Sequence, residues 1–417
     1  MDQIVKVLIL TQYYPPEMGA PQARLHELAV RLSQAGHEIT VLTAMPNYPT
    51  GKIFRGYRGR VFKTEMVDGI KVHRVPVFPT KSASPVLRLL CYSSFAAASF
   101  IAGILVARRS QLILTESPPL FLAPTGVFLK YIKRAKLVFN VSDIWPDILV
   151  RMGVGSNGFL IKCLEALESF AYRNSNVVAL TNPGAMHQIN DRFPEVATTV
   201  ISNGVDTKMF SPAKSSTHAR MKHSVSKDQF LVIYCGLHGL AQGLETVLGA
   251  AKILESDPRI RILFVGDGPV KEKLVSRAED EALKNVLFSD RIPKSEIAEL
   301  VASADLSLVP LACELPGTMP SKVYEALASG TPPIVTKGCE AEHLVNCHNS
   351  GRTFEPGDPE SLARVILELI RDPVELRRVR DNAIQLSRRF DRDKIAGETE
   401  QIIRAIAFDG DLPNVIW

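Results

Sequence analysis

One segment, Met319–Val335, combines residues that together would build a helix end suited to an anion. Pro320 is favoured in the first turn of a helix, where no amide donor is needed. Thr318 and Ser321 are good cap residues, and Gly330 is placed to end the helix before an apolar strand. The spacing therefore predicts a loop, then a short helix, then a buried strand.

Two charged residues in this predicted helix indicate what it would bind. The first turn of a helix at the edge of a parallel sheet presents N–H groups that attract anions. Lys322 would offset phosphate charge, and Glu325 would accept hydrogen bonds from the hydroxyls of an attached ring. A phosphate joined to a hydroxylated ring is typical of a sugar nucleotide, although the same pattern also occurs as ordinary helix punctuation.

Polar residues follow two apolar runs in the first half of the chain. Asp143 comes after Lys136–Val141, and Trp145 beside it would form a stacking wall for a sugar ring. The alternative is that Asp143 caps the next helix. Glu116 follows Gln111–Leu114 and is a candidate on the acceptor side, although a plain loop is the simpler interpretation.

Glycines in three loops would let the backbone approach a ligand closely. Gly19 lies in the loop after the first strand, where a structural turn is the alternative. Gly236 and Gly239 stand between a strand and a helix, so their amides would cradle a diphosphate. Gly266 begins a Gly-Asp-Gly-Pro turn that would also approach the ligand. His238 would bond phosphate, unless it is merely solvated.

A nicotinamide cofactor is disfavoured in this second half. The glycine spacing is not G-x-G-x-x-G, and no acidic residue stands at a strand end about 20 positions on. Arg291 would instead reach phosphate, and backbone groups near Ile292 would read a base edge.

Strands and helices alternate along both halves, which predicts an α/β fold of two doubly wound, Rossmann-like domains facing a cleft. We expect the domains to span residues 1–205 and 206–390, with a last helix in 391–417 crossing back onto the first. The polar stretch Ser211–Lys227 is the predicted linker. The predicted strands lie at Val5–Leu10, Glu38–Thr43, Ile70–Val75, Gln111–Leu114, Lys136–Val141, Val177–Thr181, Thr198–Ile201, Phe230–Cys235, Arg261–Val265, Val286–Ser289, Leu306–Pro310 and Pro333–Thr336.

Length, cysteines and charge narrow the class of protein. A chain of 417 residues favours two or three domains, and six scattered cysteines argue against a zinc site or disulfide framework. We therefore expect a reducing cytosol and no secretory signal. Residues 1–200 hold 22 Lys and Arg against 13 Asp and Glu, a net charge of +9, whereas residues 201–417 carry −4. The first half would meet an anionic surface, either membrane lipid or nucleic acid.

Of these two candidate partners, membrane lipid and nucleic acid, the segment Leu89–Ala107 favours membrane lipid. It has 19 residues without a charge, preceded by Arg88 and followed by Arg108 and Arg109. Its length just allows a bilayer span, but its many Ala and Ser residues make it only moderately hydrophobic. We rank an interfacial or partly buried helix first, a core helix second and a true span last.

These pieces together resemble the retaining family-4 glycosyltransferases of GT-B fold over nearly the whole chain. The stretches Thr115–Pro124 and Asp143–Pro146 look most like the bacterial subgroup that makes O-antigen and exopolysaccharide. The motifs that carry the resemblance are Tyr14–Gly19, Ser142–Asp147, Asn203–Asp206 with Phe210, Ala241–Leu244, Gly266–Pro269 and Pro320–Gly330.

The resemblance implies a nucleotide-sugar donor in the second domain, with Glu325 on the ribose, and an acceptor in the first. The family's other donor-site Glu falls on Gly317, so that carboxylate is absent or replaced, for example by Glu314. The family's phosphate-binding Arg and Lys fall near Leu237 and Gln242, so both are missing. Many relatives carry His where this chain has Asp143, which with Glu325 is the expected catalytic pair.

The expected activity is transfer of a hexose or N-acetyl amino-sugar from a nucleotide to a polyprenyl-linked saccharide; UDP is the first prediction for the nucleotide and GDP the second. The resemblance implies retention without a protein nucleophile and without a metal, on the cytoplasmic face of the inner membrane, and with no nucleic acid partner. A sugar-nucleotide 2-epimerase and a donor-binding relative without catalysis are the alternatives.

Overall fold

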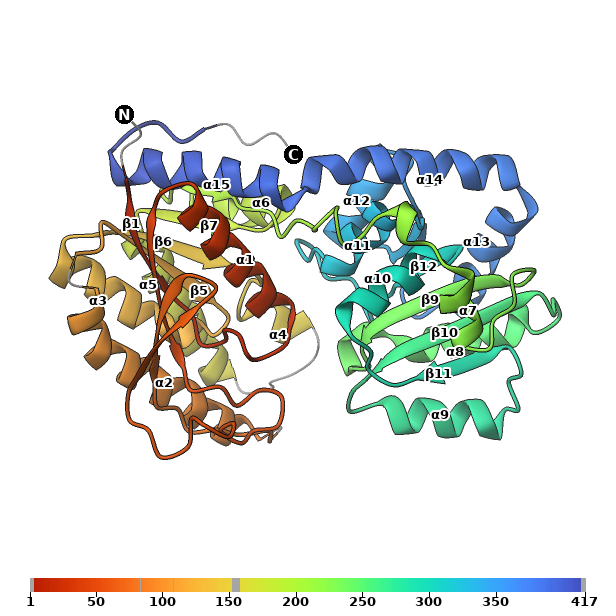
Figure 1. Cartoon of the computed structure of the whole chain (residues 1–417), viewed down its shortest axis with the longest axis horizontal. Coiled ribbons are helices and arrows are strands. Elements are labelled where there is room, and N and C mark those ends of the chain that lie inside the picture. The colour runs from red at the N-terminus through yellow and green to blue at the C-terminus, as the bar shows by residue number, and fades with distance from the viewer. Residues whose placement is uncertain (1–3, 83, 108, 152–157, 414–417) are drawn as a thin grey trace. The chain divides into compact units, whose positions relative to one another are not determined.

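The chain folds into two α/β units, each built on its own sheet (Figure 1). The computed structural model describes residues 4–82, 84–107, 109–151 and 158–413. Unit 1 comprises Met1–Asn203 with Arg392–Trp417, and unit 2 comprises Gly204–Asp391. The boundaries expected from the sequence, at 205 and 390, lie two residues and one residue from these.

Unit 1 has a sheet in the order β3-β4-β2-β1-β5-β6-β7-β8, parallel except for the β3–β4 pair. The order reverses at β1, whose neighbours are β2 and β5. Ligands of open parallel sheets bind outside the carboxyl ends of the strands at such a reversal. The strands are β1 (Lys6–Leu10), β2 (Glu38–Ala44), β3 (Lys63–Val67), β4 (Ile70–Val75), β5 (Leu112–Ser117), β6 (Lys136–Val141), β7 (Val177–Leu180) and β8 (Thr198–Val200).

Helices cover both faces of this sheet because alternate strand residues point to opposite sides. Val7 and Ile9 of β1 pack in a core with α1 and α15, whereas Leu8 and Leu10 pack in a core with α2 and α3 (Figure 1). The helices of unit 1 are α1 (Ala20–Gln34), α2 (Pro85–Val106), α3 (Ala123–Lys133), α4 (Asp147–Arg151), α5 (Gly158–Asn174), α6 (Pro183–Arg192) and α15 (Arg392–Ala407).

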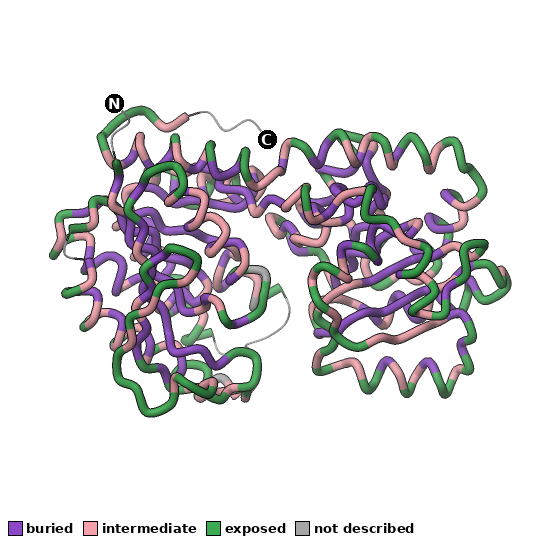
Figure 2. The backbone as a smooth tube through the Cα atoms, in the orientation of Figure 1, coloured by how far each residue is buried: buried purple, intermediate pink, exposed green. Residues whose placement is uncertain are grey.

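Unit 2 repeats the arrangement with a parallel sheet in the order β11-β10-β9-β12-β13-β14. Here the order reverses at β9, between β10 and β12. The strands are β9 (Phe230–Leu237), β10 (Ile260–Asp267), β11 (Val286–Ser289), β12 (Leu306–Val309), β13 (Pro333–Thr336) and β14 (Arg352–Phe354). The helices are α7 (Thr217–Lys222), α8 (Leu244–Leu254), α9 (Lys271–Asp280), α10 (Lys294–Ala302), α11 (Ser321–Ser329), α12 (Glu340–Cys347), α13 (Pro359–Arg371) and α14 (Pro373–Ser387). Strands of both sheets are mostly buried (Figure 2).

The doubly wound fold class is confirmed, but the sequence missed edge elements and misplaced the linker. Strand β3 forms an antiparallel hairpin with β4 through a turn at Asp68 and Gly69, both with positive φ. Ser211–Lys227 is not a linker, because it lies inside unit 2. Its small polar residues cap helices instead: the side chain of Ser216 accepts a hydrogen bond from the amide of Ala219 in α7.

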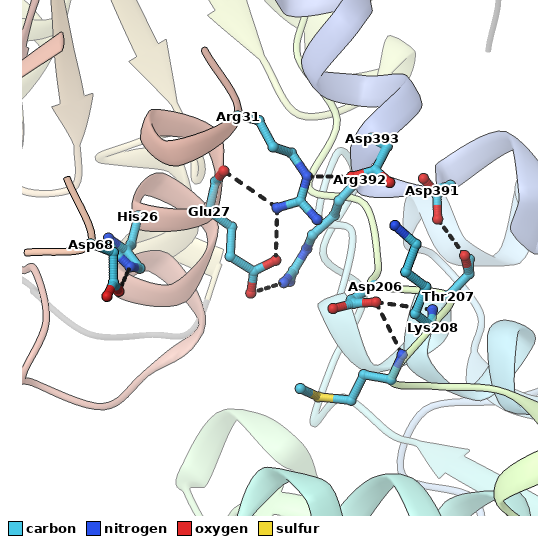
Figure 3. Close-up of polar contacts among 11 residues, drawn as sticks. His26, Glu27, Arg31, Asp68, Asp206, Thr207, Lys208, Asp391, Arg392 and Asp393 are labelled. Atoms are coloured by element: carbon cyan, nitrogen blue, oxygen red, sulfur yellow. Dashed lines mark hydrogen bonds and ion pairs between the residues drawn. The ribbon is translucent and has the colours of Figure 1, made fainter. Parts of the chain in front are cut away.

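The chain passes between the units twice, at Asn203–Gly204 and at Asp391–Arg392. Each crossing is anchored by polar contacts inside its own unit (Figure 3). In unit 2, the Thr207 hydroxyl donates to the Asp391 carboxylate. In unit 1, Arg392 at the start of α15 pairs with Glu27 of α1. These contacts explain why the last helix, as expected, completes the first unit.

Helix α2 contains the long uncharged run and is partly buried. By length and composition, Val86–Val106 is apolar and long enough to cross a membrane. Of its most apolar 18-residue stretch, 22% is buried. Cys91 and Phe95 pack into the core of unit 1. The expectation of a partly buried helix therefore agrees with the structure.

Candidate functional site

In unit 2, the predicted helix after β12 is present as α11. Gly330, with φ of 66°, ends the helix and donates its amide to carbonyl oxygens of the last turn. The N-cap is Pro320 rather than Thr318 or Ser321, which is a correction to the predicted start. Pro320 has no side-chain oxygen that could cap the first turn, so this turn can direct its amides at an anion.

Lys322 and Glu325 of α11 lie close together beside β9. The Lys322 ammonium stands 5.4 Å from the ring centroid of Tyr234, at a cation–π distance. Burial lowers the pKa of Lys322, and the nearby Glu325 carboxylate opposes that shift. A diphosphate beside this ammonium would stabilise its charged form in the same way.

Glycine is required where β9 and β10 end next to α11. Gly236 has φ of 152°, and a Cβ there would lie 2.2 Å from Cε of Lys322. Gly266 has φ of 140°, and its Cβ would lie 1.9 Å from the Gly236 carbonyl oxygen. A larger residue at Gly266 would push the two strand ends apart, and one at Gly236 would displace the Lys322 side chain. The glycines therefore bring the backbone of two loops and the Lys322 side chain to one place, and their role in binding a donor stays a prediction.

His238 is buried, so the interpretation as a merely solvated loop histidine is wrong. Its ring packs against those of Tyr234 and Phe264, at centroid distances of 5.7 and 6.2 Å. Burial lowers its pKa to about 4, so the imidazole is neutral at pH 7. Neither ring nitrogen has a hydrogen-bond partner among the described residues. A contact with phosphate would require this loop to move, because the ring does not reach the surface.

The other predicted donor residues lie in the loops after β9, β11 and β12. Arg291 is half exposed and lies 3.8 Å from Asp267, whereas Ile292 packs on a core cluster. Gly239 is the N-cap of the turn before α8, and the Thr318 carbonyl accepts from the Glu340 amide. Their roles stay predictions.

Sequence reasoning missed Lys271 of α9. Its ammonium lies 3.0 Å from the carbonyl oxygen of Gly266 and 2.5 Å from Oδ1 of Asp290. The lysine thus joins the loops after β10 and β11. The one feature of the sequence that could have pointed to Lys271 is its position just after the Gly-Asp-Gly-Pro turn. A lysine exposed on the surface would fit that position equally well.

This chain departs from the family pattern at Gly317, Leu237 and Gln242, and the structure explains the departure at Gly317. Gly317 has φ of 74°, a conformation that disfavours residues with a side chain, including Glu. Glu314 packs against Gly338 of the next loop. A Cβ added to Gly338 would lie 2.3 Å from Cγ of Glu314. Leu237 is exposed where the family has a basic residue, and the side chain of Gln242 is uncharged.

In unit 1, a buried polar cluster lies at the carboxyl ends of β5 and β6. Glu116 is 2% exposed and accepts from Asn140 Nδ2 at 2.6 Å and from Ser142 Oγ at 2.7 Å. Arg24 of α1 forms an ion pair with Glu116 and donates to Ser142 at 2.8 Å. Both oxygens of Glu116 are thus engaged by the protein, so Glu116 holds Arg24 in position. Arg24 was missed because nothing in the sequence pairs it with residue 116.

Asp143 lies beside this cluster. Burial raises the pKa of its carboxyl; the Arg24 charge lowers this pKa and the Glu116 charge raises it. Helix α4 begins only at Asp147, so Asp143 stands too early to be its N-cap. Trp145 packs in part on the neighbouring core cluster and is half-buried. The structure therefore removes the capping alternative for Asp143 and leaves its catalytic role as a prediction.

The loop after β1 is held by a buried carboxylate that sequence reasoning did not single out. Glu17 Oε1 accepts from the amides of Asn47 and Tyr48, at 2.7 and 2.8 Å. Its Oε2 accepts from the Tyr14 amide at 3.3 Å. Gly19, two residues on, is the N-cap of α1. One side chain thus fixes the loops after β1 and β2 at the reversal of the sheet.

Replacing Glu17 by Ala is expected to lower the free energy of unfolding by about 3 kcal/mol, because it leaves backbone donors of two loops without partners. Thermal or urea unfolding of the purified chain measures the change. The matched control is Glu38→Ala, since Glu38 is exposed and pairs with the surface residue Lys6 at 3.0 Å. That control should change stability by about 0.5 kcal/mol or less. An equal loss in both variants would contradict the anchoring role of Glu17.

Comparisons with known proteins agree with this architecture. Residues 19–204 match the family described as Glycosyl transferase 4-like domain, and residues 215–386 match Glycosyl transferases group 1. WcaI of Escherichia coli K12, named as a colanic acid biosynthesis glycosyl transferase, is 27% identical over 383 residues, 87% of this chain and 90% of WcaI.

Solved structures show the same fold along nearly the whole chain. Sucrose-phosphate synthase of Thermosynechococcus elongatus has a TM-score of 0.77 at 18% identity, covering 96% of this chain and 99% of that one. HepE of Anabaena, in complex with UDP and glucose, has a TM-score of 0.73 at 20% identity, covering 96% and 100%.

The two units together are those of the GT-B class of glycosyltransferases. The chain belongs to family 4 of that class, which confirms the resemblance found in the sequence. It is a glycosyltransferase enzyme.

Proposed function

We propose that this enzyme transfers a hexose or N-acetyl amino-sugar from a UDP-sugar to a lipid-linked saccharide, with retention of configuration. The observation that carries the proposal is the start of α11 in unit 2, where Lys322 and Glu325 meet the glycine ends of β9 and β10. Amides and an ammonium there suit a diphosphate, and a carboxylate one turn further suits ribose hydroxyls.

The proposed step needs no protein nucleophile. The bond between the anomeric carbon and the diphosphate oxygen breaks, and the acceptor oxygen forms a new bond on the same face. The departing diphosphate takes the acceptor's proton. Lys322 and the first-turn amides would stabilise the negative charge that develops on the diphosphate. In unit 1, Asp143 would orient the acceptor hydroxyl.

Two relatives support the choice of donor and acceptor. HepE was solved with UDP and glucose, and WcaI is named for synthesis of a cell-surface polysaccharide. By analogy, the acceptor of this enzyme would be a saccharide on a polyprenyl diphosphate. The enzyme would then work peripherally, on the cytoplasmic face of the inner membrane.

A transfer assay tests this proposal. The purified enzyme is incubated with radiolabelled UDP-sugars, and in parallel with GDP-sugars, plus a short-chain polyprenyl diphosphate saccharide; products are separated and their anomeric configuration is read by NMR. Retained product from a UDP-sugar is the expected result. A product with inverted anomeric configuration would contradict the proposed retention. Product formed from GDP-sugars alone would contradict the proposal that the donor is a UDP-sugar.

One alternative has specific support. The left-handed backbone at Gly317 and the absence of a basic pair at Leu237 and Gln242 favour a relative that binds donor without transferring it. Calorimetric binding of UDP-sugar with no product from any acceptor would establish that alternative. Release of an epimerised free nucleotide-sugar would instead indicate a 2-epimerase.

A further inference from the structure

We propose that α2 and the basic loop beside it form a surface that rests on an anionic lipid bilayer, with α2 in the plane of the interface. The inference deepens the proposed function, on which it rests for the presence of a membrane-held acceptor. Its structural basis lies entirely within unit 1.

The outward side of α2 has no charged residue from Leu89 onward and exposes large apolar side chains toward both ends of the helix. Val86, Leu90, Ile101 and Leu105 follow helical spacing on one side, and the last two are 69% and 78% exposed. No charged residue occurs from Leu89 to Ala107. The outer face of a water-exposed helix normally carries charged residues, so the uncharged outer face of α2 is unusual for a helix in contact with water.

Helix α3 extends the apolar surface sideways. The ring centroids of Phe100 in α2 and Phe128 in α3 lie 6.1 Å apart, and Tyr92 of α2 stacks on Phe121, just before α3, with centroids 5.9 Å apart. The two helices therefore run side by side, and Phe128 is 52% exposed. Single exposed apolar side chains are common, whereas a continuous patch marks an interaction site.

A basic loop borders the first half of α2. It exposes Lys52, Arg55, Arg58 and Arg60. Gly51 packs so closely on the backbone just before α2 that a Cβ would lie 2.3 Å from the Lys81 amide nitrogen.

The charged residues of the segments that form this patch are all basic. The sequence contains no Asp or Glu between residues 39 and 64, or between residues 69 and 115. An apolar stripe flanked by a basic loop complements a bilayer that contains anionic phospholipid. A partner protein or a second copy of this chain would require carboxylates facing the loop, and the patch itself offers none.

The buried side of α2 explains why the helix lies on the bilayer and does not span it. Cys91 and Phe95 belong to the core of unit 1, and the Thr125 hydroxyl of α3 donates to the Ala96 carbonyl at 3.0 Å. Gly103 approaches Leu129 so closely that a Cβ would lie 2.6 Å from its Cδ1. Spanning the bilayer would remove all of these contacts from the sheet.

The test measures binding of the full chain to vesicles by flotation. The vesicles contain phosphatidylethanolamine with phosphatidylglycerol, or phosphatidylcholine alone. We expect binding to the first and little to the second. The pair Lys52→Gln and Arg55→Gln should weaken binding about 10-fold or more at low salt. The matched pair Lys227→Gln and Lys284→Gln, exposed lysines of unit 2, should leave it unchanged.

The apolar contribution is tested in the same assay. The pair Ile101→Asn and Leu105→Asn should weaken binding about 10-fold or more, because two exposed apolar side chains no longer enter the interface. Ile253→Asn with Val374→Asn, exposed residues of unit 2, is the control. Binding unaffected by the Ile101 pair, or affected equally by its control, would overturn the proposal.

Other outcomes identify other occupants. Self-association in sedimentation velocity that the Ile101 pair abolishes, with no vesicle binding, would show a second copy on this face. Resistance of bound protein to extraction by high salt and carbonate would show a span. Both results overturn the proposal. Transfer to a water-soluble acceptor should be equal in all variants, which separates a failure of this surface from a failure of the proposed activity.

Discussion

Replacing Asp143 by Asn is expected to lower kcat by about 10² to 10⁴ while donor KM changes little, because the variant loses a carboxylate that contacts the reacting hydroxyl. Steady-state kinetics with varied donor and acceptor measure both constants. The matched control is Asp147→Asn, four residues on, since Asp147 pairs with Arg151 at 2.7 Å on the surface of α4. Comparable kcat values in the two variants would make Asp143 a structural residue.

Stability separates a catalytic from a structural role for Asp143. Burial raises the pKa of its carboxyl above that in the unfolded chain. The folded protein then binds this proton more tightly than the unfolded chain, so the contribution of Asp143 to stability falls as pH rises through the raised pKa. Asn resembles the protonated form and avoids that cost. We expect Asp143→Asn to unfold at the same or a higher temperature at pH 7, despite its low kcat.

The same shift predicts the acid limb of the pH profile. If the ionised form acts, kcat should fall as pH drops through the raised pKa, at higher pH than for an ordinary aspartate. The profile of the Asp143→Asn variant should lack this limb. An identical limb in both proteins would assign it to another group.

Replacing Glu325 by Ala is expected to raise the Kd for the donor by about 10- to 100-fold, because hydrogen bonds from ribose to a charged acceptor are lost. Isothermal titration with UDP alone measures this without any acceptor. UDP lacks the sugar, so a full effect with UDP places the contact on the nucleotide. The control Glu360→Ala removes an exposed carboxylate from the first turn of α13.

Removing Glu325 also changes the protonation of Lys322, which adds a pH dependence to this prediction. The Glu325 carboxylate raises the pKa of Lys322 against the effect of burial. Without Glu325, the ammonium loses its proton more readily, so the affinity of the variant for diphosphate should fall more steeply as pH rises. An unchanged Kd for UDP would rule out the ribose role of Glu325.

The sequence predicted the elements whose pattern is local. The apolar runs that became β1, β6 and β13 were placed within a residue of their bounds, since a strand buried on both faces needs consecutive apolar residues. Gly330 ended α11 as predicted, because only a residue that tolerates positive φ stops a helix in this way. The edge strands β3 and β14 were missed because partly exposed strands lack such runs.

The cluster around Glu116 could not be predicted in the same way. Arg24, Glu116 and Ser142 lie far apart in the chain and meet because β1, β5 and β6 are neighbours in the sheet. A single sequence carries no signal for such pairings, so Glu116 was interpreted as a possible acceptor contact. In the structure it is buried and holds Arg24. His238 was misjudged for the same reason, because its burial depends on the rings of Tyr234 and Phe264.

The sequence by itself determined the fold class, the family and the position of the helix that begins near Pro320, because these depend on local spacing and backbone geometry. The tertiary structure alone decided which charges are buried together and which faces stay exposed. Lys322 meets Gly236 because two strand ends converge at the reversal of a sheet. The outer side of α2 is exposed because its other side packs on the core of unit 1. Burial and electrostatic pairing arise from distances across the fold, which the order of residues does not contain.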